Sequence, residues 1–319
     1  MNLSATTTKT FSLLSIGQRG VGKTVFLAGS YTELHPDTPS NNPQQLWFDC
    51  QDNEVQANLE KITNYVARTG QYPPPTIKIT NFNFSLKRQS VLGAKTVCDF
   101  RWWDVPGESC NIHNPEFQEM ILGSNGCCVF INVHALIEDQ DYSRLLEDIF
   151  NQVAAIASVV YKYNIQYAFA LIFTKCDLLE LNSGIKLQIE QSLQPLITYL
   201  DTVKATYQTF YSAIPIVSVK GVSSFKATGA ANALLWLLSQ LDNSSSPQDL
   251  ASGLSENSPN KTLPLTSRKS ILIIFLVSAG LVGAIASLLF VLNPFTPVPQ
   301  PTPTTEQPAN QTQKNNLAN

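Results

Sequence analysis

Charged residues are scarce in this chain. Asp, Glu, Lys and Arg make up 14% of its 319 residues, and the formal net charge is only −3, whereas about 25% of an ordinary soluble protein is charged. The sequence has no run of lysine and arginine with interleaved aromatics, and it has no acidic block. We therefore expect no nucleic-acid partner, which would need a basic surface, and no solvated acidic tail.

Cysteine pairs and histidine clusters are also missing. None of the six cysteines stands in a CxxC pair with zinc-finger spacing, and the three histidines share no spacing with acidic or cysteine partners. We expect reduced thiols in a cytosolic domain and histidines with structural roles. The N-terminal segment MNLSATTTKT predicts neither a secretory signal peptide nor N-myristoylation, because it lacks a basic region followed by an apolar one and has no glycine at position 2.

The last quarter of the chain differs in composition from the rest. Residues 243–270 are rich in Ser, Asn and Pro without helical or strand periodicity, which indicates a flexible linker. Residues 271–292 contain no charge and are long enough to cross a membrane as one helix, which needs about 20 residues. Residues 293–319 predict a disordered tail rich in Pro, Thr and Asn. Residues 1–242 remain for a globular domain.

Basic residues flank the expected membrane span on one side only. Three of them precede it within the linker, whereas the next basic residue after it is Lys314. The positive-inside rule then places residues 1–270 in the cytoplasm, and a bacterial inner membrane fits this arrangement. Within the span, Ala279, Gly283 and Ser287 recur every four residues and would let two helices approach closely as a homodimer. Such residues are also common in membrane helices that do not associate.

Strand-length apolar runs alternate with helical patterns in the first 242 residues. This alternation predicts an α/β fold with a mostly parallel central sheet and helices on both faces. The expected strands are 11–16, 77–86, 96–103, 126–133, 168–173 and 214–219. The expected helices are 23–34, 53–68, 142–163, 184–202 and 227–240.

The segment after the first expected strand reads GQRGVGKT, which fits G-x-x-x-x-G-K-[ST] between a strand and a helix. Its glycines let backbone N–H groups and the helix N-terminus point at a phosphate chain. Lys23 would neutralise the β- and γ-phosphates, and Thr24 would offer its hydroxyl to Mg²⁺. The residues expected to bind the phosphates are Gly17, Gly20, Val21, Gly22, Lys23, Thr24 and Val25.

Three further short segments follow expected strands. Asp104 in WDVPGE ends a strand beside the phosphate loop and is the expected carboxylate on the Mg²⁺ side, and Gly107 would bring its N–H to the γ-phosphate. In TKCD, Asp177 would accept two hydrogen bonds from guanine, and the stem of Lys175 would lie across the base. The remaining expected base contacts are Thr174 and, in the segment SVK, Ser218, Val219 and Lys220.

These four motifs resemble those of the Ras-like and translation-factor GTPases over residues 11–242. The segment LEKITNYVARTGQYPPPTIKIT followed by WWDVPGE is similar, more narrowly, to bacterial double-GTPase-type domains. The resemblance implies a P-loop fold that binds GTP or GDP with Mg²⁺ and switches between two states. It also implies a threonine that closes on Mg²⁺ and the γ-phosphate; Thr76 is the first candidate and Thr69 the second.

Two residues depart from that family pattern and predict slow turnover. Glu108 stands where relatives position water with glutamine or histidine, and its negative charge beside the γ-phosphate is unfavourable. Arg19 lies within the phosphate loop at a usually small position, where it would act as an internal arginine finger or point into solvent. We expect a membrane-anchored GTPase with low intrinsic activity and an unidentified effector or activator. The alternative is a nucleotide-binding membrane scaffold without meaningful hydrolysis.

Overall fold

The computed structural model describes residues 8–35, 46–75, 78–91, 93–106, 109–111 and 113–242. The expected linker, membrane span and tail lie outside these residues, as do the helix-contact residues Ala279, Gly283 and Ser287 and the switch candidates Thr76, Gly107 and Glu108. Among the described residues, no helix has the length and apolar character needed to cross a bilayer.

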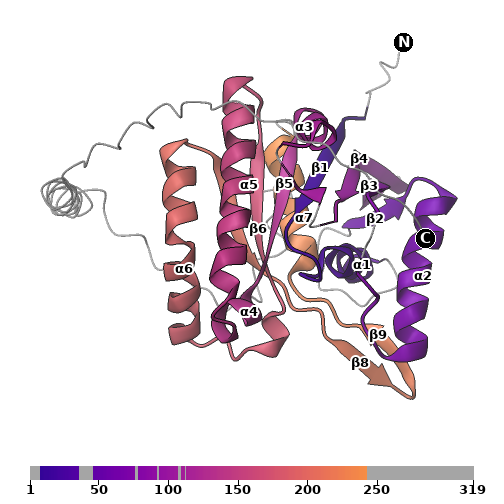
Figure 1. Ribbon diagram of the computed structural model, residues 1–319. Helices are drawn as coiled ribbons and strands as arrows, with labels where there is room; N and C mark the ends of the chain where they lie inside the picture. The colour runs from indigo at the N-terminus through magenta and orange to yellow at the C-terminus, as the bar shows by residue number, and fades with distance from the viewer. Residues whose placement is uncertain are drawn as a thin grey trace, which may run out of the picture. The chain divides into compact units, whose positions relative to one another are not determined.

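A seven-stranded sheet forms the centre of the domain, in the order β2-β3-β4-β1-β5-β6-β7 (Figure 1). Strands β1, β4, β5, β6 and β7 run parallel, and β3 pairs antiparallel with both β2 and β4, so the expected α/β class with a mostly parallel sheet is confirmed. The strands are β1 (Thr10–Ile16), β2 (Leu46–Cys50), β3 (Thr80–Ser90), β4 (Gly93–Asp104), β5 (Gly126–Asn132), β6 (Ala168–Thr174) and β7 (Thr206–Tyr211).

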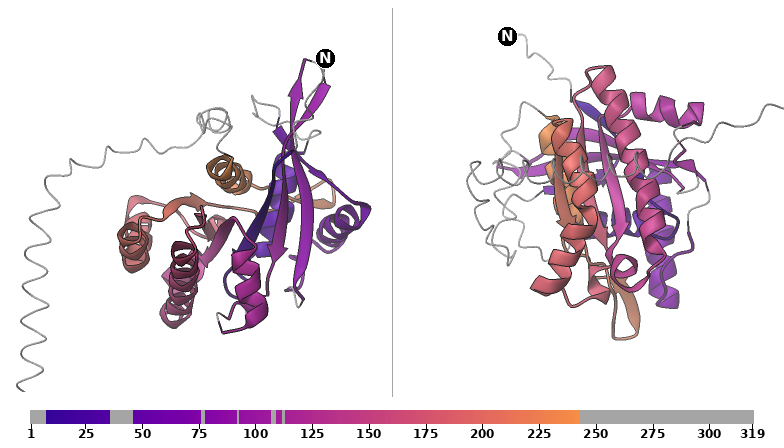
Figure 2. Two further views of the ribbon diagram at one scale, coloured as in Figure 1. Left: turned by 90° about the horizontal axis from the view of Figure 1, so that it is seen from above. Right: turned by 60° about the vertical axis from the view of Figure 1, so that its left-hand side comes forward.

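Helices cover both faces of the sheet (Figure 2). Buried residues of α1, α2 and α7 join one hydrophobic layer, and those of α3, α5 and α6 join the other. The helices are α1 (Lys23–Glu33), α2 (Asn53–Thr69), α3 (Pro115–Leu122), α4 (Val133–Glu138), α5 (Tyr142–Lys162), α6 (Ser183–Thr202) and α7 (Ala230–Leu241).

Strand alternation assigns neighbouring residues to opposite layers. Trp102 is fully buried in the layer of α1, whereas Trp103 packs against the layer of α5, because adjacent strand residues point to opposite faces of the sheet. Cys127 and Cys128 divide in the same way and are both fully buried. All six cysteines are free thiols, and only Cys50 is not buried.

Helix α2 carries the chain from the edge of the sheet towards the ends of the strands. Its N-terminus is capped by Asp52, whose side chain accepts a hydrogen bond from the backbone N–H of Val55. Its C-terminus stops at Gly70, which adopts the left-handed conformation (φ 62°) that glycine enters without strain. The chain then turns into the segment Gln71–Pro75, whose placement matters for the site.

Two features of the last third differ from expectation. The segment expected as the final strand of the sheet, 214–219, instead contributes β8 (Ile216–Val219) to a separate hairpin with β9 (Val222–Phe225). The sheet ends with β7, which was not expected because the edge strand TYQTFY is only half covered and lacks a continuous apolar run. Strand β2 and the short helices α3 and α4 were also missed.

Candidate functional site

The loop between β1 and α1 has the backbone conformation that its sequence predicts. Gly17 adopts φ 141°, and a Cβ there would lie 2.8 Å from the carbonyl oxygen of Phe130, so only glycine fits between this loop and β5. Gly22 is the N-cap residue of α1, and no side chain caps the N-terminus of this helix. Backbone N–H groups at the start of α1 therefore face the loop without a side-chain acceptor, which suits an anion.

Lys23 lies inside the loop rather than in solvent. Its Nζ donates to the carbonyl oxygens of Gly17 at 2.8 Å and Gln18 at 3.1 Å, and the residue is 7% exposed. These carbonyls hold a buried ammonium group in place within the loop that would surround a phosphate chain. The lysine is thus positioned to exchange loop carbonyls for phosphate oxygens.

Thr24 and Asp104 meet although 80 residues separate them in the sequence. Thr24 Oγ1 donates to Asp104 Oδ2 at 2.6 Å, and Asp104 is almost fully buried at the end of β4. Ser15, at the end of β1, fixes the same corner, because its hydroxyl donates to the carbonyl oxygen of Trp103 at 2.7 Å. A hydroxyl and a carboxylate side by side are the oxygen ligands that Mg²⁺ prefers, so these residues fit the expected metal.

Thr174 connects the two halves of the site. Its hydroxyl, at the end of β6, lies 2.8 Å from the carbonyl oxygen of Val21 in the phosphate loop and 3.2 Å from that of Ile131 in β5. Lys175 follows with a positive φ of 60° and starts the short 3-10 helix Cys176–Leu178. The TKCD segment is therefore held against the phosphate loop, and its turn exposes the side chain of Asp177.

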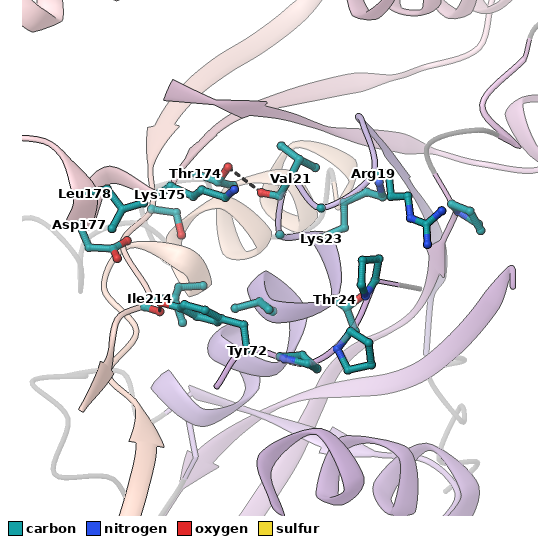
Figure 3. A pocket seen from close by; sticks show the side chains of 18 residues that line it. Arg19, Val21, Lys23, Thr24, Tyr72, Thr174, Lys175, Asp177, Leu178 and Ile214 are labelled. Carbon is teal, nitrogen blue, oxygen red and sulfur yellow. Dashed lines mark hydrogen bonds between the residues drawn. The ribbon is translucent and has the colours of Figure 1, made fainter. Parts of the chain in front are cut away.

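A cleft of about 340 Å³ lies between these two segments (Figure 3). Arg19, Lys23 and Thr24 lie on one side of it, and Lys175, Asp177 and Leu178 lie on the other. The structure therefore brings together most of the residues that the sequence predicts for phosphate and base. Those that line the cleft are Arg19, Gly20, Val21, Gly22, Lys23, Thr24, Val25, Thr174, Lys175 and Asp177.

Tyr72 also lines the cleft, and it was not identified from the sequence. Its hydroxyl donates to the carbonyl oxygen of Ile214 at 2.9 Å, and its ring stacks on Phe225 of β9 with centroids 6.4 Å apart. Burial raises the pKa of Tyr72 above its ordinary value, and the nearby carboxylate of Asp177 raises it further. The phenol therefore stays a neutral donor at physiological pH.

The residues expected to make the final contact with the base do not line the cleft. Ser218, Val219 and Lys220 lie in the β8–β9 hairpin and are not among the described residues that line the cleft. Ser212 and Ile214, which follow the unexpected strand β7, line it instead. The signal that was overlooked is the pair Ser212 and Ala213, directly after the strand TYQTFY. In TKCD a small polar residue, Thr174, stands at the end of a strand in the same way.

The proline-rich segment after α2 reaches the cleft as well. Pro73, Pro74 and Pro75 line it, as does Pro106 of the DVPGE motif. The next residues along the chain, Thr76 and Gly107, lie outside the described residues, as does Glu108. The second threonine candidate, Thr69, uses its hydroxyl at the end of α2, where it donates to the carbonyl oxygen of Tyr65 at 2.7 Å.

Comparison with known proteins adds a fold-level likeness only. No protein-family model matches the chain, and no curated protein matches it. One solved structure that the comparison matched to this chain is that of the Arl6 BBS3 small GTPase from Trypanosoma brucei with a bound nucleotide analogue, GppNp. The sequences are 12% identical, the TM-score is 0.39, and the match covers 74% of this chain and all of that chain. At this distance the likeness assigns neither a family nor an activity.

Proposed function

We propose that this domain binds a guanine nucleoside triphosphate with Mg²⁺ and acts as a nucleotide-gated switch that hydrolyses GTP slowly to GDP and phosphate. The observation that carries the proposal is the single cleft in which Lys23 and Thr24 face Lys175 and Asp177. A triphosphate nucleotide needs a cationic, N–H-rich end for its phosphates and a separate end for its base. Both ends are present in one cleft.

Guanine is favoured by the carboxylate of Asp177. Guanine presents two adjacent N–H groups that one carboxylate can accept, whereas adenine offers no such pair and would leave the carboxylate unsatisfied. The turn at Lys175, held by Thr174, fixes where that carboxylate projects. Tyr72 and Ile214 supply the apolar wall on which a purine ring would rest.

Mg²⁺ would be held by Thr24 and Asp104 together with phosphate oxygens, and it would neutralise charge on the phosphates. The chain itself orients the triphosphate through the loop of residues 17–24 and the ammonium of Lys23. Arg19 lines the same side of the cleft as Lys23 and Thr24, where the γ-phosphate would lie. Glu108 places a carboxylate in the segment expected to position water, which favours slow hydrolysis.

The switch would consist of two segments that end at the cleft. Pro75 and Pro106 line it, and they precede Thr76 and the pair Gly107 and Glu108 directly in the chain. Threonine and glycine at those positions would contact the metal and the γ-phosphate only while the triphosphate is bound. Loss of the γ-phosphate would release both segments and change the surface offered to an effector or activator.

The sequence of residues 271–292 supports anchoring of this domain at a membrane, with residues 1–270 in the cytoplasm and a bacterial inner membrane as the setting. Association of two chains through Ala279, Gly283 and Ser287 would bring two nucleotide domains together. A second function, a nucleotide-binding membrane scaffold without meaningful hydrolysis, is favoured by Glu108 alone.

The test uses the purified full chain in detergent. GTP binding is measured by competition with ATP, and phosphate release is followed in the wild type and in the Lys23→Ala and Asp104→Ala variants. We expect GTP to compete far better than ATP and phosphate release to be slow but dependent on both residues. Equal competition by ATP contradicts the guanine site. If the wild-type chain releases phosphate no faster than the two variants do, the scaffold function is favoured.

A further inference from the structure

The proposed function leaves one edge of the sheet without a role. The cleft lies at the carboxyl ends of the parallel strands. Strands β1, β5, β6 and β7 begin at the opposite end of the sheet, and we call this surface, formed by the amino-terminal ends of the strands and not by an edge strand, the start edge. Helices α5 and α6 each run back from the cleft side, so their C-termini at Lys162 and Thr202 reach the start edge. In Figure 1 this edge lies at the top.

The described chain leaves the domain at this same edge. Asp242, directly after α7, pairs with Lys9, directly before β1, at 2.9 Å. Nearby, the side-chain amide of Gln166 donates to the carbonyl oxygen of Gln240 at 3.1 Å. The next residues, 243–270, are the polar linker that leads to the expected span at 271–292. A chain tethered through Asp242 therefore has its start edge, not its cleft, nearest to the attachment point.

Exposed aromatic and apolar side chains lie at two places along the start edge, the end of α5 and the tip of the β3–β4 hairpin. Tyr161, in the last turn of α5, is 78% exposed, Tyr163, directly after α5, is 56% exposed, and Val91 is fully exposed at the tip of the β3–β4 hairpin. Tyrosine is enriched where proteins meet the membrane–water interface, because its ring is apolar and its hydroxyl is polar.

The same edge has an excess of positive charge. Lys95, Lys162 and Lys204 are exposed there, and the ammonium of Lys162 lies 5.4 Å from the centroid of the Tyr163 ring. Asp242 is paired with Lys9 and Asp49 with Lys87, whereas Asp201, which accepts from the hydroxyl of Tyr207, and the exposed Glu119 keep their negative charges. The exposed lysines Lys95, Lys162 and Lys204 therefore outnumber these carboxylates and can attract an anionic surface.

A hollow of about 510 Å³ lies between the α5–β6 and α6–β7 connections. Tyr161, Asn164 and Lys204 contribute to its lining. An amide, a phenol and an ammonium group around a solvent-filled hollow can hydrogen-bond the phosphate and glycerol oxygens of a lipid headgroup. The hollow gives the edge a shape that headgroups can enter.

We propose that the start edge is a membrane-contacting surface that binds the anionic headgroups of a phospholipid bilayer through Lys95, Lys162, Lys204, Tyr161 and Tyr163. This inference rests on the proposed membrane anchor, which keeps the surface close to lipid. Contact would hold the domain with its cleft pointing away from the bilayer, accessible to nucleotide and to cytoplasmic partners. Each lysine near an anionic surface contributes on the order of a fivefold gain in affinity.

The experiment compares the full chain in two kinds of vesicle, one of phosphatidylcholine alone and one of phosphatidylcholine with phosphatidylglycerol. Amide hydrogen exchange is measured by mass spectrometry over residues 161–166 and 203–206, and over the β8–β9 hairpin as an internal reference. We expect exchange at the start edge to slow at least about fivefold when the anionic lipid is present. Exchange in the hairpin stays the same.

The variant Lys95→Glu/Lys162→Glu/Lys204→Glu is expected to remove this slowing. The matched control, Lys61→Glu/Lys186→Glu/Lys226→Glu, changes the net charge equally but alters lysines of α2, of the start of α6 and of the segment after β9. We expect it to retain the slowing. Equal exchange in the two vesicle types, or equal loss in both variants, overturns the proposal.

Two measurements on the same samples separate this inference from the proposed function. Sedimentation with the uncharged vesicles reports the anchor by itself, and GTP binding reports the cleft. Slowed exchange that depends on anionic lipid, together with absent GTP binding, contradicts the nucleotide site and leaves the membrane surface standing. Normal GTP binding, together with exchange that anionic lipid does not slow, contradicts the membrane surface and leaves the nucleotide site standing.

Discussion

Tyr72 provides the sharpest test of how the cleft retains a nucleotide. Its hydroxyl bond to the carbonyl oxygen of Ile214 and its stacking on Phe225 hold the segment after α2 over the base side of the cleft. A hydrogen bond of this type contributes about 0.5–1.5 kcal/mol, and an aromatic pair contributes about 0.5–1.5 kcal/mol beyond its area. The two contacts together amount to ~2 kcal/mol.

Two substitutions separate these contacts. Tyr72→Phe keeps the ring and removes only the hydroxyl bond, so we expect bound nucleotide to dissociate about fivefold faster, equivalent to ~1 kcal/mol. Tyr72→Ala removes both contacts and opens the cleft, so we expect dissociation ~30-fold faster or more. Association should change little, because most affinity differences within one site appear in the dissociation rate.

The assay is release of a fluorescent GDP analogue, chased with excess GDP and followed by stopped-flow fluorescence. Tyr65→Ala is the matched control, because Tyr65 is a partly exposed tyrosine of α2, 37% exposed, and does not line the cleft. The control should release nucleotide at the wild-type rate. If Tyr72→Ala also releases at that rate, Tyr72 does not close the site and the reasoning from its contacts is refuted.

Three further predictions follow from particular side chains. Asp177→Asn should weaken GTP binding at least tenfold and improve binding of xanthosine triphosphate, whose extra carbonyl can accept from an amide; unchanged GTP competition would contradict the role of Asp177. Glu33→Ala should lower the free energy of unfolding by about 1–3 kcal/mol in urea titrations, because Glu33 accepts from the backbone N–H groups of Gly229 and Ala231 at the start of α7; the exposed Glu54 mutated likewise serves as control. The free energy of unfolding should fall at alkaline pH. Burial raises the pKa of Cys98 and of Tyr142 to about 12 from ordinary values of 9.0 and 10.0. Both groups bind their protons more tightly in the folded protein, so their contribution to the free energy of unfolding is complete below pH 9 and is lost progressively up to about pH 12. Thermal melts between pH 8 and 11 check this (roughly the unfolded-state range of these groups), and a midpoint that does not fall would contradict it.

Local sequence determined the elements with the strongest patterns. The apolar runs at 126–133 and 168–173 became β5 and β6, which lie in the middle of the sheet and are buried on both faces. The phosphate loop was equally readable, because its glycines and Lys23 are required by backbone geometry within eight consecutive residues. The helix at 53–68 was found from the spacing of Val55, Leu59, Ile62 and Val66, of which all but the partly buried Ile62 are buried.

The sequence pattern did not predict the structure correctly at the edge strands of the sheet or at the hairpin that follows β7. Strands β2 and β7 have partly exposed faces, so their side chains do not alternate clearly. The run at 214–219 is apolar enough for a sheet strand, yet Lys220 and Gly221 both take positive φ and turn the chain back into a hairpin. The expected base contacts at Ser218, Val219 and Lys220 moved with it, and Ser212 and Ile214 took their place at the cleft.

The sequence by itself determined which chemical groups this protein offers to the proposed nucleotide, because the loop of residues 17–24, the DVPGE turn and the TKCD turn are each encoded within a few residues. Only the tertiary structure decided which distant segments complete the cleft. Thr24 meets Asp104, and Tyr72 meets Ile214, across 80 and 142 residues of chain. Such contacts follow from strand order and helix packing, which a local pattern does not contain.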